Sequence, residues 1–396
     1  MNCDVVFEGG GAKGIALVGA WQEFQAQGHG YNRILGTSAG AIMAAFLAAG
    51  YSTQELLAVL SEKQNGRPVL ATFLGDPEFG DAEDVSQSVI AGVLRNVDLP
   101  FVPDALGASL NTRIVRAMLT QPRFRNIYSF VERGGWYSAD AFVAWLQAKL
   151  DSGEVQGKPR NYSGMTLQQF FDATGVDLSL VAADTSAGKM LVLNHHTAPG
   201  CPLVWAVRMS MSIPLLWQEV EWQQAWGSYQ GKPLAGHAIV DGGLLSNFPL
   251  ELFISDQEHV TRLMGPKQNV PVVGFLIDEA RPLSDVMAVP RGVGRVLAES
   301  RTFQRISRLI DTATTAHDKL VMEAYAQLVV RLPANGYGTT EFDMSDERRA
   351  ALIEAGRLAT QQHLAKFPPG QASRGVESPA AMRQMVDRIA TELLAP

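Results

Sequence analysis

The chain has 396 residues, of which 46% are hydrophobic and 18% charged, and its formal net charge at pH 7 is −7. This composition is typical of a globular protein with a large core, and the negative charge argues against nucleic acid as a partner. The two cysteines, Cys3 and Cys201, exclude a disulfide framework and fit a reducing compartment. The first residues resemble no secretory signal, so we expect a cytoplasmic protein, although export without a cleaved signal leaves no such mark. Because no apolar stretch is long enough to span a bilayer, we expect any membrane contact to be peripheral.

The first 50 residues alternate between strand and helix signals. Short apolar runs at 4–8 and 31–35 predict buried strands, and each ends at glycines. Apolar residues at helical spacing predict helices over 14–27 and 39–49. This rhythm is typical of an α/β fold, and we expect a three-layer α/β/α arrangement around a mainly parallel sheet.

The rest of the chain divides into three parts. From 53 to 165 helical patterns dominate, which predicts a helical insertion or lid, with helices at 53–63, 82–95, 109–119 and 138–150. Strand signals resume at 178–183, 190–194, 238–240 and 270–277. The remainder reads as largely helical, with a loop near 333–337. We therefore expect one domain over 1–280 and a helical C-terminal region over 281–396.

Ser38 lies in a G-x-S-x-G pattern formed with Gly36 and Gly40. This pattern is typical of a serine on a sharp strand-to-helix turn, where small neighbours leave the hydroxyl accessible. A predicted strand precedes it and a predicted helix follows it. We therefore interpret Ser38 as a nucleophile, the alternative being a tight turn with an incidental serine.

A second glycine-rich segment, from Gly9 through Gly10 and Gly11 to Gly14, also follows a predicted strand. Glycines there let backbone N–H groups approach a ligand closely. Such donors stabilise the oxyanion of an acyl-transfer reaction, and removing one costs about 10²–10³ in rate. We predict that the first three glycines form this site, with Lys13 adding positive charge or only capping the loop.

The nucleophile needs a base. Six histidines follow Ser38, and none has a distinctive setting: His195, His196, His237, His259, His317 and His363. Asp241 is the better candidate, because it ends an apolar strand, and residues at the carboxyl ends of parallel strands converge. Gly242 and Gly243 follow it, so a turn-forming aspartate is the alternative. An aspartate is a weak base at its ordinary pKa of about 3.9, which makes the oxyanion donors essential to this hypothesis.

Together these three blocks resemble the signature of the patatin-like phospholipase family. Three further segments are similar to patatin-family sequence, at 135–138, 181–184 and 208–214. The order and spacing of these motifs most resemble the bacterial branch of the family, which includes secreted phospholipase effectors. The resemblance covers residues 4 to about 280. The resemblance implies a Ser38–Asp241 dyad that acts without histidine, hydrolysis of lipid acyl esters, and support from Gly14, Gly36, Gly40, Gly242 and Gly243.

Two other kinds of site find little support. The first glycine segment also fits G-x-G-x-x-G, but the second strand ends without the acidic residue that dinucleotide binding requires. Adjacent His195 and His196 would point to opposite faces of a strand, and the acidic stretch 76–84 lacks the spacing of a calcium loop. We therefore expect no metal and no cofactor.

We expect a phospholipid or a membrane surface as the substrate partner. The arginine-bearing segment 291–308 has partly helical apolar spacing, and three tryptophans lie close together at Trp217, Trp222 and Trp226. Either could contact lipid or pack on the protein. Two alternatives stay open: another acyl hydrolase or acyltransferase with the same dyad, and a lipase blocked until a protein or small-molecule activator binds.

Overall fold

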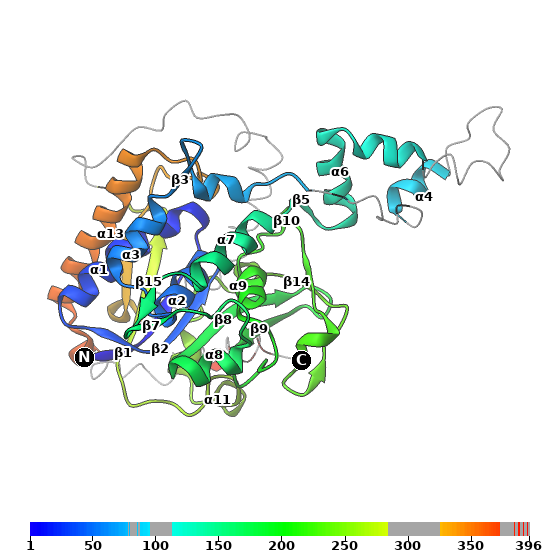
Figure 1. Ribbon diagram of the computed structural model, residues 1–396. Helices are drawn as coiled ribbons and strands as arrows, with labels where there is room; N and C mark the ends of the chain where they lie inside the picture. Colours follow the sequence, from blue (N-terminus) through cyan, green and yellow to red (C-terminus); the bar gives the residue numbers. More distant parts are fainter. Residues whose placement is uncertain are drawn as a thin grey trace, which may run out of the picture.

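The computed structural model describes residues 1–77, 79, 85, 88–95, 113–283 and 325–372, and five single residues near the end (384, 387, 388, 391 and 394). Figure 1 shows a body in which helices surround a central sheet, and a helical arm that projects from this body. The arginine-bearing segment 291–308 and His317 lie outside the described residues.

Five strands of the central sheet are parallel to one another. In spatial order they are β8 (Asp177–Asp184), β2 (Gly30–Thr37), β1 (Asn2–Phe7), β15 (Val272–Asp278) and β16 (Val329–Pro333). Most of their residues are buried, because helices and loops cover both faces of the sheet. Phe275 of β15 packs edge-on against Phe24, while a side chain at its neighbour Gly274 would collide with Phe248 on the other face.

Three antiparallel strands complete the sheet beside β8. They are β9 (Lys189–Leu193), which pairs with β8, then β14 (Ala238–Asp241), which also pairs with β8, and β11 (Val220–Glu221) beyond it. The fold is therefore α/β with a mixed, mostly parallel sheet. All six strands predicted from the sequence are present, and their ends differ from the prediction by at most two residues.

Two long helices cross closely on one side of the sheet (Figure 1). They are α1 (Ala16–Ala26), which follows the short helix η1 (Gly11–Ile15), and the C-terminal α13 (Asp346–Lys366). A Cβ at Gly19 would lie 1.8 Å from the Ile353 carbonyl oxygen, and one at Gly356 would lie 2.2 Å from the Ala16 carbonyl oxygen. Glycine at both positions thus permits this close crossing.

The structure of residues 281–396 differs in part from the helical region that the sequence predicts. The strand β16 lies within this region, where a helical pattern was expected, and it forms one edge of the central sheet. The segment Val-Val-Arg-Leu-Pro alternates too briefly to distinguish strand from helix, and pairing with β15 decides its conformation. The division of the chain at residue 280 stays a prediction.

Shorter elements fill the connections around the sheet. They are α2 (Ala39–Ala48), α3 (Thr53–Leu60), β3 (Lys63–Gln64), β4 (Arg67–Pro68), η2 (Val69–Phe73), β5 (Gly135–Tyr137), α7 (Asp140–Leu150), β6 (Glu154–Val155), β7 (Lys158–Pro159), α8 (Leu167–Thr174), α9 (Leu203–Ser210), β10 (Leu215–Trp217), η4 (Gln224–Trp226), β12 (Ser228–Tyr229), β13 (Lys232–Pro233), η5 (Gly242–Leu244), α10 (Glu251–Ile254), α11 (Glu258–Met264), η6 (Ala326–Leu328) and α14 (Pro369–Ala372).

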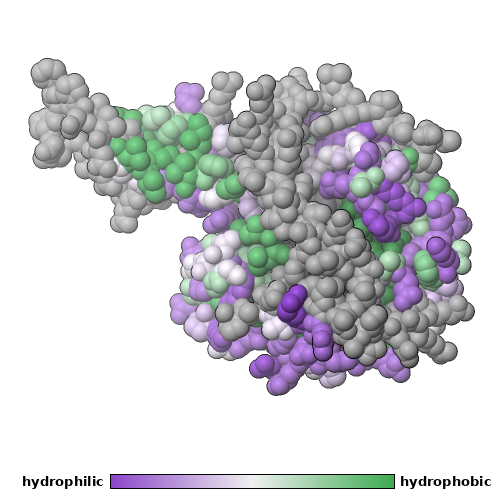
Figure 2. Space-filling model, turned by 180° about the vertical axis from the view of Figure 1, so that it is seen from behind, coloured by the Kyte–Doolittle hydropathy of each residue, from purple (hydrophilic) through white to green (hydrophobic). Residues whose placement is uncertain are grey.

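The projecting arm comprises α4 (Val89–Arg95), a helix over 113–119 and α6 (Pro122–Glu132) (Figure 1). It has a small core of its own, formed by Val85, Ala91, Val115, Leu119 and Tyr128. Its outer surface is also apolar, and Figure 2 shows hydrophobic side chains gathered there. The exposed set is Val89, Val93, Met118, Ile127 and Val131. These exposed apolar side chains distinguish the arm from the rest of the described surface, which has two others of this kind, Met1 and Leu215.

Candidate active site

Ser38 occupies a sharp turn between β2 and α2. Its backbone angles are φ 53° and ψ −120°, a conformation that non-glycine residues adopt rarely and at a cost in free energy. The flanking glycines are required by close packing, because a Cβ at Gly36 would lie 2.2 Å from the Gly40 carbonyl oxygen. At Gly40 a Cβ would lie 2.2 Å from the Phe7 carbonyl oxygen. The strand-turn-helix context predicted for this motif is therefore present.

Two serines, one the last residue of α9 and the other two residues beyond it, hold the ends of the two predicted catalytic elements. The Ser38 N–H donates to Ser210 Oγ at 3.1 Å, and Ser210 Oγ donates to the Val181 carbonyl oxygen at 2.6 Å. The Asp241 N–H donates to the Ser212 carbonyl oxygen at 2.9 Å. Sequence reasoning noted segment 208–214 but gave these serines no role. The signal in the sequence that could have indicated their role is the presence of two serines within an otherwise apolar stretch at the end of a helix.

Asp241 reaches Ser38 by a different route from the one expected. The prediction assumed a parallel strand, but β14 runs antiparallel to β8, so that premise is wrong. Register brings the residues together instead: Thr37 pairs with Val181, and Asp241 pairs with the next residue of β8, Ala182. Because β9 pairs along the other edge of β8, β2 and β14 share one edge, and Ser38 and Asp241 meet where these two strands end.

Burial controls the chemistry of the Asp241 carboxyl. Its Oδ1 accepts the Gly243 N–H at 2.8 Å, and its Oδ2 is buried without a regular hydrogen bond in the described structure. Burial raises the pKa of Asp241 to about 7, against the smaller lowering effects of the Ser38 hydroxyl and the Gly243 N–H. A carboxyl with such a pKa is a much better proton acceptor near neutral pH than an ordinary aspartate.

The glycine loop lies beside Ser38 and leaves two donors free. The Gly9 N–H donates to the Asn247 carbonyl oxygen at 3.3 Å, and the Ala12 N–H donates to Thr339 at 2.8 Å. Within the described residues the N–H groups of Gly10 and Gly11 have no acceptor. The prediction for the oxyanion donors thus narrows to these two groups.

Five of the glycines in the loop and in the turn after Asp241 show how closely these segments pack against their surroundings. A Cβ at Gly9 would lie 2.8 Å from Ser38 Cβ, and one at Gly14 would lie 2.5 Å from Ala39 Cβ. Gly11 has φ 54°, and a Cβ there would lie 2.2 Å from the Thr339 carbonyl oxygen. Cβ atoms at Gly242 and Gly243 would lie 2.5 Å from the Val181 carbonyl oxygen and 2.8 Å from Asn247 Oδ1, respectively.

Lys13 is buried beside the glycine loop and forms an ion pair with the half-exposed Glu279. Both residues line a polar recess that also includes Ser38, Asp241 and Asn247. Lys13 is therefore part of the wall of the site, with its charge already balanced by a carboxylate.

Ser38 lies where this recess meets an apolar cavity. The cavity extends between α2, α3 and α7, and its walls are almost entirely apolar. It is lined by Ile15, Ile42, Phe46, Leu56, Leu70, Phe73, Trp145, Met211, Trp217 and Phe342, among others. Ser38, Gly11 and Ile213 line both spaces. The nucleophile candidate thus faces a polar space on one side and an apolar space on the other.

A patatin-like phospholipase family model matches residues 5–254, which is more than half of the chain. The chain belongs to the patatin-like phospholipase family. It is 28% identical over 375 residues to YqhO of Bacillus subtilis (strain 168), an uncharacterized protein, which covers 93% of this chain and 99% of that protein. An uncharacterized NTE family protein of Mycobacterium tuberculosis (strain ATCC 25618 / H37Rv) is 26% identical over 371 residues, covering 92% of this chain and 46% of that protein.

A more distant relative carries a lipid-related name. It is a probable lipid hydrolase of Invertebrate iridescent virus 6, 19% identical over 250 residues, which covers 63% of this chain and 62% of that protein. Among solved structures, VipD from Legionella pneumophila aligns with a TM-score of 0.44 and 16% identity, over 92% of this chain and 67% of VipD. The type III effector ExoU aligns with a TM-score of 0.38 and 16% identity, over 92% of this chain and 53% of ExoU.

No described histidine lines the apolar cavity or the polar recess at Ser38. His237 Nδ1 lies 2.8 Å from Asp184 Oδ2, and His363 contacts the Gln327 carbonyl oxygen at 3.1 Å. Burial is the main reason that the pKa of His195 is lowered to about 4, and the charge of the nearby His196 lowers it further. The described geometry therefore offers Ser38 a carboxyl and no imidazole.

The three neighbouring tryptophans noted in the sequence lie inside the protein. Trp217, Trp222 and Trp226 are all buried, and the last two pack edge to face with ring centroids 5.7 Å apart. The Trp217 indole N–H donates to the Phe73 carbonyl oxygen at 3.0 Å. Of the two alternatives left open by the sequence, packing on the protein is therefore the one observed, and contact with lipid headgroups is not. Among the described helices, none is both long and apolar enough to cross a membrane.

Proposed function

We propose that the protein hydrolyses acyl esters of phospholipids or lysophospholipids, with Ser38 as nucleophile and Asp241 as base. The observation that carries this proposal is the position of Ser38, beside a buried carboxyl with a pKa of about 7 and between a polar and an apolar space. An ester lipid has this same division, since its acyl chain is apolar and its headgroup is polar.

In the proposed reaction, Ser38 Oγ attacks the ester carbonyl carbon while its proton passes to the Asp241 carboxylate. The carbonyl oxygen becomes an oxyanion and accepts hydrogen bonds from the Gly10 and Gly11 N–H groups. The ester bond then breaks, and the protonated carboxyl returns its proton to the leaving alcohol. Water next attacks the acyl-serine with Asp241 again as base, which releases the fatty acid and restores Ser38.

The apolar cavity supports an assignment of the acyl chain to its interior. Residues of α2 and α7, such as Phe46 and Trp145, give it an apolar lining, so an acyl chain would leave water as it enters. The recess with Lys13 and Glu279 would then receive the polar part of the lipid. This arrangement agrees with a lipid substrate better than with a small water-soluble ester.

The projecting arm supports contact with a membrane surface. Val89 and Val93 of α4 are each 59% exposed, and Ile127 and Val131 of α6 are each 44% exposed. Each pair is spaced i, i+4, so its members lie on one face of their helix. Segments 88–95 and 113–133 contain six arginines and one glutamate, although acidic residues precede them in 76–84. Apolar side chains among basic ones suit an anionic bilayer, so we assign the arm to the membrane surface.

Reaction with a fluorophosphonate tests the nucleophile assignment. The reagent forms a phosphonate ester with an activated serine and loses fluoride, and peptide mass mapping identifies the modified residue. We expect modification at Ser38, slowed about 100-fold or more in Asp241→Asn, which is the usual contribution of a general base. Modification of another residue with Ser38 intact would contradict the assignment. A reaction that needs added cell extract would instead favour the activator-dependent form.

A further inference from the structure

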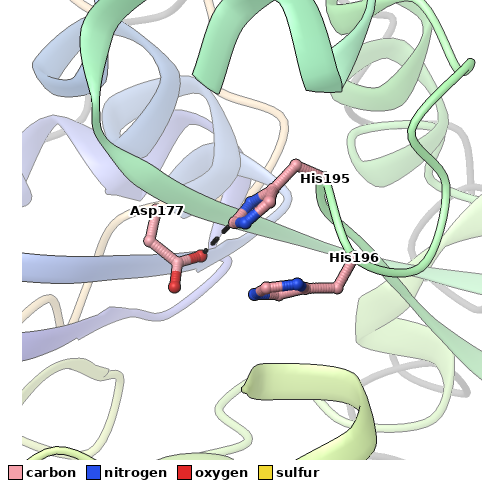
Figure 3. Close-up of side chains that lie close together, drawn as sticks. All are labelled: Asp177, His195 and His196. Carbon is pink, nitrogen blue, oxygen red and sulfur yellow. Dashed lines mark ion pairs between the residues drawn. The ribbon is translucent and has the colours of Figure 1, made fainter. Parts of the chain in front are cut away.

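A second cluster of chemically reactive side chains lies at the opposite end of β8 from the Ser38 site. Asp177 is the first residue of β8, and His195 and His196 lie two and three residues beyond the end of the antiparallel β9 (Figure 3). His195 Nδ1 lies 3.8 Å from Asp177 Oδ1. One ligand atom from each of the three residues lies within 4.8 Å of the others.

The two histidines lie together because they are not part of a strand. The sequence argument that they point to opposite faces assumed an extended chain, but β9 ends at Leu193 and the residues after it form a turn. Their ring centroids are 3.8 Å apart with an interplanar angle of 41°. That argument against a metal site is therefore wrong for this pair.

The turn that carries the histidines is held by the fully buried Asn194. Its Oδ1 accepts the N–H groups of His196 at 2.9 Å and Thr197 at 3.0 Å. Its Nδ2 donates to the Leu263 carbonyl oxygen at 2.9 Å and to Ser179 Oγ at 3.0 Å. These four bonds connect the turn to β8 and α11, so the backbone that carries the ligands is fixed in place.

One imidazole is held by ring packing. The His195 ring stacks on Phe171 of α8, with centroids 3.8 Å apart and an interplanar angle of 5°. His196 is exposed, and Gly265 after α11 lies beside its Nε2, where a Cβ would be 3.2 Å away. One ligand is therefore oriented by packing, and another remains accessible from solvent, which gives an ion a path of entry.

The Asp177 carboxylate faces the two imidazoles without a hydrogen bond of its own among the described residues. It is only partly exposed. The Arg33 guanidinium on the neighbouring strand pairs with Asp4 and donates to the Met264 carbonyl oxygen at 2.9 Å. The charge of Arg33 acts on Asp177 without a hydrogen bond, and a metal ion between the carboxylate and the two imidazoles would give it a direct partner.

We propose that Asp177, His195 and His196 bind a divalent transition metal ion of the Zn²⁺ type. Two imidazole nitrogens and one carboxylate oxygen are ligands that Zn²⁺ accepts, with water in a fourth position. Two ligands at about 2.1 Å from one ion lie about 3.4 Å apart in tetrahedral geometry. The 3.8 Å separation of His195 and Asp177 therefore needs only a small side-chain rotation.

The site would join the start of β8, the turn after β9 and, through Phe171, α8. Because Asp177 pairs with Arg33 and Val181 pairs with Thr37, most of the length of β8 separates the ion from Ser38. The ion would stabilise this part of the fold and would not take part in ester hydrolysis. This inference does not rest on the proposed function, and its test uses no activity measurement.

Zinc binding to tag-free protein, first treated with a chelator and then dialysed, tests the proposal by calorimetry and thermal unfolding. We expect saturable binding of one ion and a rise in Tm with zinc concentration, because a ligand that binds only the folded state stabilises it. Asp177→Asn and His196→Gln should each weaken binding about tenfold or more. His196 is exposed, so its substitution should leave the metal-free Tm unchanged even if Asp177→Asn lowers it.

His237→Gln is the matched control, because His237 contacts Asp184 at the other end of β8. This variant should bind zinc like the wild type. Absence of saturable binding in the wild type would overturn the proposal. Binding that is equally strong in Asp177→Asn and His196→Gln would also overturn it, since the ion would then lie elsewhere.

Discussion

The Ser38 N–H donates its hydrogen bond to Ser210 Oγ, which in turn donates to the Val181 carbonyl oxygen. This chain of two bonds connects the strained turn to the central strand β8. It also occupies the Ser38 N–H, so that group is not available to an oxyanion. Ser210 is thus a positioning residue for the proposed nucleophile.

Ser210→Ala should lower both stability and activity. The variant leaves the Ser38 N–H without its acceptor, which costs about 1–3 kcal/mol of unfolding free energy. A displaced nucleophile should lower kcat tenfold or more with little change in KM. Urea denaturation and steady-state kinetics measure the two effects.

Thr360→Ala is the control for Ser210→Ala, because Thr360 is also a buried hydroxyl and donates to the Gly356 carbonyl oxygen at 2.9 Å within α13. We expect some loss of stability in this variant, with kcat unchanged. An equal fall of kcat in both variants would mean that Ser210 acts only through general stability.

Gly11→Ala should abolish hydrolysis. The added Cβ would collide with the Thr339 carbonyl oxygen and displace the loop whose N–H groups are the proposed oxyanion donors. Loss of such a donor lowers kcat by about 10²–10³. Gly336→Ala is matched in backbone strain, since Gly336 has φ 84°, but a Cβ there meets nothing within 4 Å. It should lose about 1 kcal/mol of stability and keep its activity.

The raised pKa of Asp241 predicts how activity depends on pH. The proposed base is the ionised carboxylate, so kcat/KM should rise with pH and level off above about 7. A pH–rate profile on a soluble ester measures this. A plateau that already begins near pH 5 would show that the carboxyl titrates like an ordinary aspartate.

The same shift makes a prediction about stability with the opposite sign. Asp241 keeps its proton in the folded state up to about pH 7, whereas the unfolded chain loses it near 3.8. The folded state therefore binds more protons between these values, and the contribution of Asp241 to stability falls as pH rises through this window. Asp241→Asn should be more stable than the wild type at pH 8, by up to a few kcal/mol. Denaturant unfolding at pH 8 and pH 4.5 should show this advantage shrinking at the lower pH.

Charged substitutions on the arm should weaken membrane binding and leave the chemistry intact. In Val93→Glu and Ile127→Glu an exposed apolar side chain becomes anionic, which disfavours contact with an anionic bilayer. Each variant, made in the inactive Ser38→Ala protein, should sediment less with phosphatidylglycerol vesicles. When the same substitutions are made in protein that retains Ser38, hydrolysis of a short soluble ester should be unchanged.

Gln147→Glu is the control for the arm variants, because it adds the same charge at an exposed position of α7 on the body. It should bind vesicles like its parent. Equal vesicle binding by all three variants would remove the arm from the membrane-contacting surface.

The sequence predicted the strands and the glycine-rich turns because these depend on local patterns. Ser38 required a strand, a turn and a helix in order, and the sequence carries all three signals. Asp241 was selected for an incorrect reason, since the direction of β14 depends on the pairing of distant strands. β16 was missed because its short segment becomes a strand only through pairing with β15.

Burial was the property that sequence reasoning judged least well. The pKa of Asp241 depends on how completely neighbouring elements exclude water, which no local pattern records. For the tryptophans near 217–226 the sequence left open whether they contact lipid or pack on the protein, and the fold buries them. Conversely, Val93 and Ile127 look like core residues in the sequence and are exposed, because the helices that carry them project from the body.

Fatty-acid release from mixed phospholipid vesicles, measured in parallel with wild type, Ser38→Ala and Asp241→Asn in the presence of a chelator, tests the Ser38–Asp241 hydrolase most directly. The account predicts that the wild type releases fatty acid and that neither variant does. The wild type does so without any addition, or with added cell extract if an activator is required. Circular dichroism should show all three proteins folded. Release by folded Asp241→Asn at the wild-type rate, or by Ser38→Ala, would contradict it.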